Sequence, residues 1–539
     1  MPSDDLHEAG NEPSATETAA TAPPPPEPLY SALTPRQKMA AVMIVSFVAM
    51  ISPLAGNIYY PAISTLANEF DVSTSMIQLT ITTYQIFQGV APTVIANYSD
   101  IYGRRPAYAI CLVAFLAANI GLALQTSYPA LMVLRCLQST GSSATVALGA
   151  GAVADMVTRA ERGRFISYAA LGVTLGPALA PIIGGLLVQN LGWRSIFWFL
   201  AIYAGVVFGI YFVFVPETAR SVVGNGDVSP KSIFMTPSQY LELKRRRNRS
   251  NTASPIADQA TTTTAAAAAA AAAATTTKPQ QRKTINPFAA LKILGEREGA
   301  VTVGFGALIY GGYFMVLTTL PLQLTDRFHL NAAQTGLCYL PIFIGTICSR
   351  WTAGRLLDWN YRRHARRLGL DISRDREQRQ DELDLVPVEA ARMQICIPMI
   401  YVSAVCVVVY GWTVQARASL AGIEVALFFL GLFNSGGLVG LSTLIMDTHP
   451  ENPAAATAAN NMFRYLVSAG ATAVAVPLIE RIGIGWTSVF IGGVWACFSP
   501  FLWLVMIYGA QWRLKKKAKM EAAKEKETEK RQREDQSRS

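Results

Sequence analysis

Residues 99–106, Ser-Asp-Ile-Tyr-Gly-Arg-Arg-Pro, concentrate charge in a turn between two long apolar stretches. Gly103 permits a tight reversal of the chain. Asp100 could cap the positive end of a neighbouring helix, and Arg104 and Arg105 could pair with it. Such contacts would latch two groups of helices on one side of a membrane and break when the groups move. The alternative is a hairpin whose cations only set its orientation.

A second feature is an arginine inside an apolar stretch. Gln138 and Ser142 follow Arg135 at helical spacing, so a helix would place all three on one face. Counted from Tyr128, Arg135 would lie ~10 Å into a bilayer, where an arginine is costly unless it faces a watery cavity or a partner. Arg135 and Gln138 are therefore predicted to bind substrate or couple transport. The alternative is a buried arginine that holds helices together through backbone carbonyl groups.

Another cation at membrane depth is Arg464, one helical turn after Asn460. Other polar and aromatic side chains are predicted at the same membrane depth. Together with Asn460 and Arg464, they would line a cavity that contains more hydrogen-bond donors than acidic groups. They are Gln85, Gln88, Asn57, Tyr310, Tyr313 and Asn434. Each could alternatively be a contact between helices worth ~0.6 kcal/mol.

Several kinds of chemistry have no candidate residues in this chain. The sequence has no Gly-x-x-x-x-Gly-Lys-Ser/Thr loop, so ATP does not drive the protein directly, and no cofactor is predicted. All four histidines fall outside the predicted spans, and no metal site is predicted. No carboxylate lies in the middle of a span, so the residues alone do not establish a proton relay.

The elements that must position these residues are membrane helices. Charged residues make up 15% of the chain and hydrophobic ones 51%, whereas a soluble domain carries about 25% charged residues. Apolar runs of ~20 residues, long enough to cross a bilayer, recur along the chain. The twelve predicted spans cover residues 38–60, 76–96, 106–126, 129–155, 164–190 and 195–215, followed by 299–322, 333–356, 394–414, 420–446, 454–478 and 486–509.

The spans form two halves that repeat. Asp100 follows the second span as Asp358 follows the eighth, and Asp155 ends the fourth span as Asp447 ends the tenth. Such a repeat is typical of transporters whose site lies between two bundles near the bilayer midplane. The predicted parts are a disordered tail (1–37), a six-helix bundle (38–218), a low-complexity loop (219–297), a second six-helix bundle (298–510) with a charged loop (359–393), and a charged tail (511–539).

The net charge of +10 is unevenly distributed. Cations collect in the even-numbered connections, in the central loop and in the tail, which is typical of membrane orientation signals and not of nucleic-acid binding. The positive-inside rule therefore places both termini and the central loop in the cytoplasm.

The fifth predicted span combines small residues with prolines. Gly172 and Gly176 lie four residues apart, which permits close helix packing, and Pro177 permits bending. This combination predicts a helix at a moving bundle interface, although packing alone would explain the glycines.

These motifs resemble the major facilitator superfamily (MFS), specifically the fungal twelve-span drug:H+ antiporter group. Residues 100–105 (Asp-x-x-Gly-Arg-Arg) look like its loop 2–3 motif, and residues 131–141 (Leu-x-x-x-Arg-x-x-Gln-x-x-Gly) look like its fourth-helix motif. Residues 172–177 (Gly-x-x-x-Gly-Pro) look like its fifth-helix antiporter motif. Residues 57–61 and 460–464 are similar to the quinidine-resistance and citrate-exporter branch. The family's usual first-helix acid is missing, with Asn57 nearby.

The resemblance implies an all-α MFS fold and export of small organic molecules, such as drugs or secondary metabolites, across the plasma membrane by alternating access with proton antiport. Arg135 would be the coupling or substrate residue, Asp100 and Arg104 the latch, and Gly176 with Pro177 the hinge. Expected partners are the substrate, the lipid bilayer and protons, but no nucleic acid. The chain is expected to be a monomer and not an enzyme.

Two alternatives stay open. The first is an exporter of an organic acid such as citrate, because Arg135 and Arg464 without intramembrane acids suit an anion. The second is a transport-inactive scaffold or receptor that uses its long cytoplasmic segments to bind partners.

Overall fold

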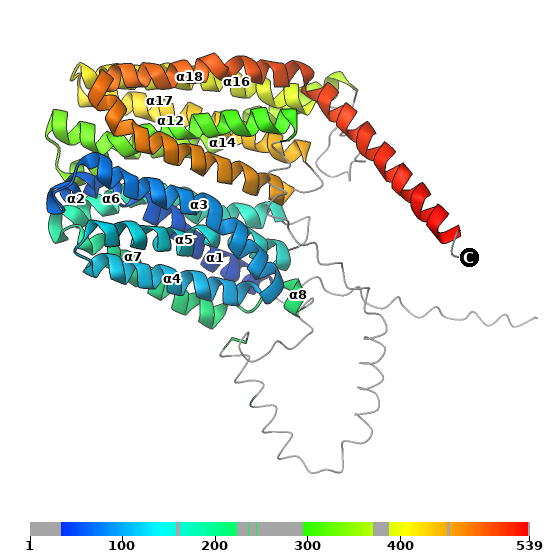
Figure 1. Cartoon of the computed structure of the whole chain (residues 1–539), viewed down its shortest axis with the longest axis horizontal. Helices are drawn as coiled ribbons and strands as arrows, with labels where there is room; N and C mark the ends of the chain where they lie inside the picture. The colour runs from blue at the N-terminus through cyan, green and yellow to red at the C-terminus, as the bar shows by residue number, and fades with distance from the viewer. Residues whose placement is uncertain are drawn as a thin grey trace, which may run out of the picture.

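The computed structural model describes residues 34–157, 162–223, 235–236, 244, 295–369, 387–449 and 453–536. Long helices dominate this part of the chain and run side by side between two ends of the molecule (Figure 1). One end, at the right of Figure 1, carries the turn at Gly103 and the arginines of the even-numbered connections. We call it the arginine-rich end, and we call the other the opposite end. Most of the predicted central loop and the predicted N-terminal tail lie outside the described residues.

The first half of the chain forms one bundle of long helices, drawn in blue to green in Figure 1. The long helices are α1 (Pro35–Asn57), α3 (Thr74–Tyr102), α4 (Arg104–Leu124), α5 (Tyr128–Met156), α6 (Arg162–Leu191) and α7 (Arg194–Phe214). Short elements accompany them: η1 (Tyr60–Ala62), α2 (Ile63–Glu69) and α8 (Arg220–Val223).

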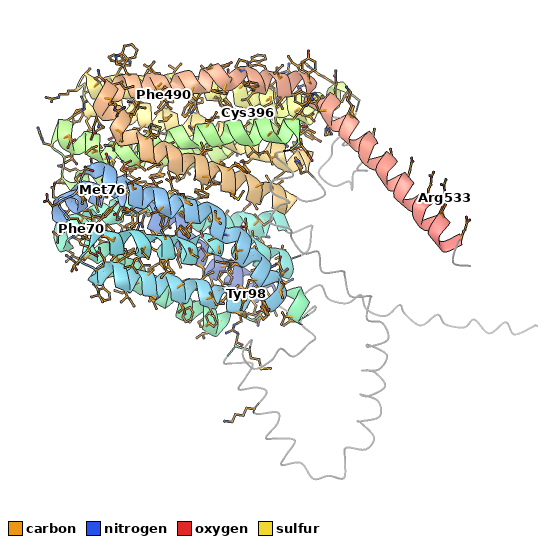
Figure 2. The ribbon with its side chains drawn as sticks, in the orientation of Figure 1. Phe70, Met76, Tyr98, Cys396, Phe490 and Arg533 are labelled. Carbon is orange, nitrogen blue, oxygen red and sulfur yellow. The ribbon has the colours of Figure 1, made fainter. Side chains whose placement is uncertain are left out.

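The second half forms the other bundle, which lies above the first in Figure 1. Its helices are α12 (Arg297–Phe328), α13 (Ala332–Leu337), α14 (Leu340–Arg367), α16 (Val388–Gln415), α17 (Leu420–Thr448) and α18 (Pro453–Gln536). Gly483 breaks α18 with φ = 80°, so this element holds the last two predicted spans. Beyond them α18 continues as the arm that carries Arg533 in Figure 2.

Local sequence explains where the helices begin and end. The hydroxyl of Thr34 accepts a hydrogen bond from the amide of Gln37, and the side chain of Gln37 accepts one from the amide of Thr34. This reciprocal cap satisfies amide groups that the first turn of α1 leaves without helical partners. Gly103 lies between α3 and α4 with φ = 103°, a conformation that glycine adopts without strain.

The helices agree with a polytopic membrane protein. In the described part of the chain, nine helical segments are long and apolar enough to span a membrane. The segment Ala456–Lys515 counts once among them although Gly483 divides it, and the more polar α3 and α5 are not included. With these three additions the helices are consistent with the twelve predicted spans.

One predicted boundary differs clearly from the structure. Hydropathy predicts the eighth span at residues 333–356, but the first residues of this range form a separate short helix, α13, and α14 continues to Arg367. The apolar run ends where the lipid ends, whereas the helical backbone continues to satisfy its own hydrogen bonds in water. Hydropathy therefore marks the end of the span and not the end of the helix.

Candidate functional site

The site centres on Arg135 of α5, whose side chain is fully buried. Its guanidinium carbon lies 4.4 Å from the ring centroid of Tyr59 and 4.3 Å from that of Tyr84. An arginine held between two aromatic faces is attracted by the negative π surface of each ring. Tyr59 precedes η1 and Tyr84 lies on α3, so three segments of the first bundle meet at this cation.

A chain of amide groups orients the arginine. Arg135 donates to the side-chain oxygen of Gln138 (2.6 Å), and Gln138 donates in turn to Asn119 on α4 (2.7 Å). Asn119 donates to the carbonyl of Phe115 (2.7 Å). The two remaining guanidinium nitrogens of Arg135, Nε and one terminal nitrogen, are buried without a hydrogen-bond partner among the described residues. Buried donors of this kind are costly, which favours an arginine that meets a ligand over one that only holds helices together.

Arg464 has a parallel environment in the second bundle. Its guanidinium carbon lies 4.0 Å from the centroid of Tyr310, and Tyr310 meets Tyr465 edge to face at 5.6 Å. Asn460, one turn earlier, donates to Ser442 of α17 (3.4 Å). Unlike Arg135, Arg464 is only partly buried. Among the described residues, no carboxylate lies within ion-pair distance of either arginine.

The other predicted lining residues fall into three groups. Gln85 accepts hydrogen bonds from Ser468 (3.0 Å) and Thr472 (3.4 Å) of α18, so it joins the two bundles. Gln88 donates to Ser52 (3.3 Å) and Asn57 donates to the carbonyl of Pro53 (2.7 Å), both within the first bundle. Tyr313, half-buried, and Asn434, buried with an unpartnered amide nitrogen, belong to the second bundle.

The arginine-rich end holds two matching ion clusters. In the first bundle, Arg104 lies 2.7 Å from Asp100 and 3.0 Å from Asp155. In the second, Arg392 lies 3.1 Å from Asp447 and 3.9 Å from Asp358. Each cluster ties together the ends of three helices: α3, α4 and α5 in one bundle, and α14, α16 and α17 in the other.

Sequence reasoning missed two members of this network. Arg392, the counterpart of Arg104, was assigned to a charged loop because hydropathy alone does not reveal that α16 begins at Val388. Glu217, which follows α7, is not among the predicted site residues. Its carboxylate accepts hydrogen bonds from the amides of Arg104 (2.9 Å) and Arg105 (3.0 Å). Glu217 therefore caps the N-terminus of α4, a role the sequence had suggested for an acid in the turn itself.

The two bundles meet chiefly at the opposite end and near the middle of the helices. Gln78 donates to the carbonyl of Thr318 (3.0 Å), and Gln189 accepts from the amide of Ala333 (3.2 Å). Tyr60 stacks on Tyr339 with ring centroids 6.1 Å apart. By contrast, the ion pairs at the arginine-rich end that join two described residues, those of Arg104, Arg392, His449 and Arg513, each lie within one bundle. The bundles are thus joined at the opposite end in this structure.

The glycines of α6 allow its backbone to touch α1. A Cβ built on Gly172 would lie 2.0 Å from the carbonyl oxygen of Ser46, and one on Gly176 would lie 2.9 Å from Pro53. Pro177 lies inside α6, directly after the second contact. Small residues are needed at both contacts, so α6 and α1 pack backbone to backbone.

Comparison with known proteins identifies the chain. The model of the Major Facilitator Superfamily matches residues 45–472. The chain belongs to this superfamily. It is therefore a multi-pass membrane transporter of the all-α MFS fold and not an enzyme.

This MFS transporter has fungal relatives along most of its length. It is 43% identical to the MFS-type transporter clz19 of Cochliobolus lunatus over 92% of this chain and 88% of the relative. It is 31% identical to the multidrug transporter QDR2 of Candida glabrata over 94% of this chain and 85% of the relative.

Solved structures confirm the MFS fold of the transporter. The xylose transporter XylE from E. coli superimposes with a TM-score of 0.58 over 86% of this chain and 97% of its own, at 14% sequence identity. The human organic anion transporter MFSD10 (TETRAN) gives a TM-score of 0.51 at 14% identity, over 87% of this chain and all of its own.

Proposed function

We propose that the transporter exports small organic molecules, such as drugs or secondary metabolites, from the cytoplasm across the plasma membrane by alternating access with proton antiport. The observation that carries the proposal is Arg135, a cation buried between Tyr59 and Tyr84 with two guanidinium nitrogens unpartnered. The multidrug transporter of Candida glabrata, a full-length relative, supports the substrate class.

The site chemistry fits planar organic substrates. Tyrosine rings at Tyr60, Tyr310 and Tyr465 offer faces for stacking, which depends little on the detailed shape of a ligand. Arg135 and Arg464 supply donors to carbonyl, hydroxyl or acidic groups of the cargo. The ion clusters around Arg104 and Arg392 would hold each bundle rigid while the bundles rock. Gly176 and Pro177 would supply the flexible contact between α6 and α1.

The proposal is tested by transport into proteoliposomes. Purified Arg135→Ala should lose at least about tenfold of the proton-gradient-driven transport of a fluorescent drug, because a hydrogen-bonding and cation–π anchor is worth more than about 1.4 kcal/mol. Arg135→Lys should retain part of it, since the charge remains but the planar donor fork is lost. Full transport by both Arg135→Ala and Asp100→Ala would refute the mechanism.

A second candidate, export of an organic acid, is favoured by the two arginines that have no carboxylate partner among the described residues. Counterflow with labelled citrate and with a lipophilic cation separates the two candidates. Exchange of citrate alone would select the acid, and exchange of the cation alone would select the drug.

A further inference from the structure

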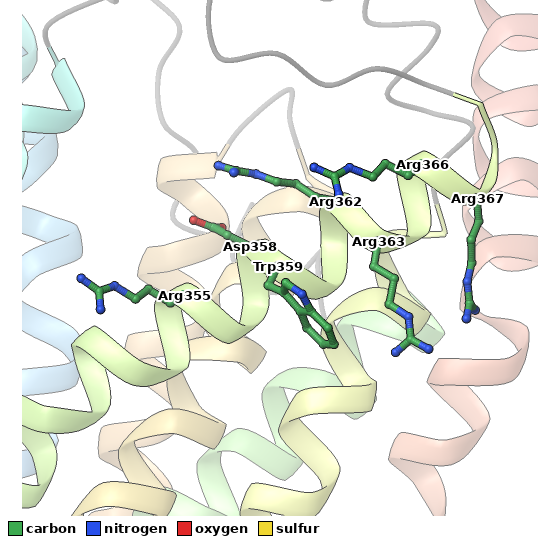
Figure 3. Close-up of a pocket in the computed structure, with 7 residues that line it drawn as sticks. All are labelled: Arg355, Asp358, Trp359, Arg362, Arg363, Arg366 and Arg367. Carbon is green, nitrogen blue, oxygen red and sulfur yellow. The ribbon is translucent and has the colours of Figure 1, made fainter.

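The extension of α14 at the arginine-rich end carries a concentration of arginines that lie outside the candidate transport site. Its last turns form a pocket of about 570 Å³ that is lined by one helix (Figure 3). The lining consists of five arginines, one tryptophan and one carboxylate: Arg355, Arg362, Arg363, Arg366 and Arg367, with Trp359 and Asp358. The carboxylate is already engaged, because Asp358 lies 3.9 Å from Arg392.

The spacing of these residues continues an exposed face of the helix. Ile344, Trp351 and Trp359 are 47%, 70% and 56% exposed, whereas the other face of α14 is buried against its bundle. Arg355 lies four residues before Trp359, and Arg362 and Arg366 lie three and seven residues after it, so the three arginines lie on this same face. A bilayer in contact with the apolar part of this face would meet the arginines at the level of its headgroups.

The position of Trp359 is a second observation that points to the headgroup region of a bilayer. Trp359 lies between Arg355 and Arg362 on the exposed face of α14, and tryptophan prefers the headgroup region of a bilayer. The guanidinium of Arg363 lies 5.6 Å from the ring of Trp359, which holds it beside the interface. Figure 3 shows both side chains projecting from the same side of α14.

From this geometry we infer that the end of α14 binds the phosphorylated headgroup of an anionic phospholipid. Planar guanidinium groups match phosphate oxygens with paired hydrogen bonds, and clusters of four to eight cations beside a membrane helix attract anionic lipids. A headgroup bound there would lie beside the cluster formed by Asp358, Arg392 and Asp447, which ties together the ends of α14, α16 and α17. The inference does not depend on which molecule the protein exports.

The test measures binding of fluorescent short-chain phosphatidylinositol bisphosphate to the full-length protein in nanodiscs of neutral phosphatidylcholine. The variant R362Q/R363Q/R366Q/R367Q should bind at least about tenfold more weakly. A matched control, K515Q/K516Q/K517Q, removes cations from the tail at the same end of the molecule and should change binding less than twofold.

A second variant distinguishes loss of lipid binding from misfolding of the protein. Replacing the same four arginines by lysine keeps the charge, and this variant should retain more of the binding than the glutamine variant. Equal binding by wild type and the glutamine variant would overturn the proposal, as would an equal loss in the tail variant. Competition by soluble inositol trisphosphate or inorganic phosphate as strong as that by the bilayer lipid would assign the site to a soluble anion and overturn the lipid assignment.

Discussion

At the scale of single residues, the molecule uses buried charge in two distinct ways. Arg104 and Arg392 are compensated by pairs of aspartates and act as fasteners at helix ends. Arg135 and Arg464 are stabilised mainly by tyrosine rings, which attract a cation without cancelling its charge. The paired arginines, Arg104 and Arg392, suit a rigid part of the protein. The arginines between tyrosine rings, Arg135 and Arg464, keep a positive potential that can attract a ligand.

The cap on α4 gives a prediction about stability. Replacing Glu217 by alanine removes the acceptor for the amides of Arg104 and Arg105 and should lower the free energy of unfolding by about 1–2 kcal/mol. Thermal unfolding in detergent measures this effect. Glu69→Ala is the control, because Glu69 forms only a half-exposed ion pair with Arg194 (3.3 Å) and should change the melting temperature little. An equal change in both variants would contradict the capping role.

Residue-level prediction succeeded where partners lie on one helix. Gln138 was expected beside Arg135 from their spacing, and the two side chains are hydrogen-bonded. The rings of Tyr59 and Tyr84 could not be predicted as partners, because they come from other segments and only tertiary packing brings them together. Spacing in sequence reports contacts within a helix and says nothing about contacts between helices.

At the scale of elements, hydropathy predicted which segments form membrane helices but did not predict where those helices end. The predicted spans correspond to the long helices, but α14 runs on to Arg367 and α18 runs on to Gln536. In both places backbone hydrogen bonding continues after the hydropathy pattern has changed. The short helices α2 and α13 were not separated from the spans next to them, because hydropathy does not show where one helix ends and the next begins.

The packing of α6 on α1 can be tested with single methyl groups. Gly172→Ala places a Cβ 2.0 Å from the carbonyl oxygen of Ser46, so the helices must separate, and both the melting temperature and the transport rate should fall. Gly205→Ala is the matched control, since a Cβ there meets nothing within 4 Å and alanine is the better helix former. This control should be neutral or slightly stabilising. If Gly172→Ala were as stable and active as wild type, the close packing of α6 on α1 would not be required for stability or transport.

At the scale of the whole molecule, the seam is closed at the opposite end. Gln78, Gln189 and Tyr60 of the first bundle contact Thr318, Ala333 and Tyr339 of the second. Alternating access requires these contacts to break when the site opens to the other side. The strength of these contacts therefore sets the balance between the state that is closed at the opposite end and the state that is open there.

A disulfide across the seam tests this requirement. In a background without the seven native cysteines, Gln189→Cys with Ala333→Cys should form a crosslink under mild oxidation and stop transport, and reduction should restore it. The controls are the two single variants, Gln189→Cys and Ala333→Cys, which cannot form the crosslink and should keep transporting under the same oxidation. Continued transport by the crosslinked seam variant would show that the bundles need not part there.

The cap on α4 also has a consequence for how the protein is made. Asp100 and Arg104 leave the ribosome almost together and can pair at once, whereas Asp155 arrives only with the end of α5 and Glu217 only after α7. The N-terminus of α4 is thus completed only when the whole first bundle has been synthesised. A nascent chain that stalls before residue 217 presents uncapped amides at the membrane surface, which distinguishes an unfinished bundle from a finished one.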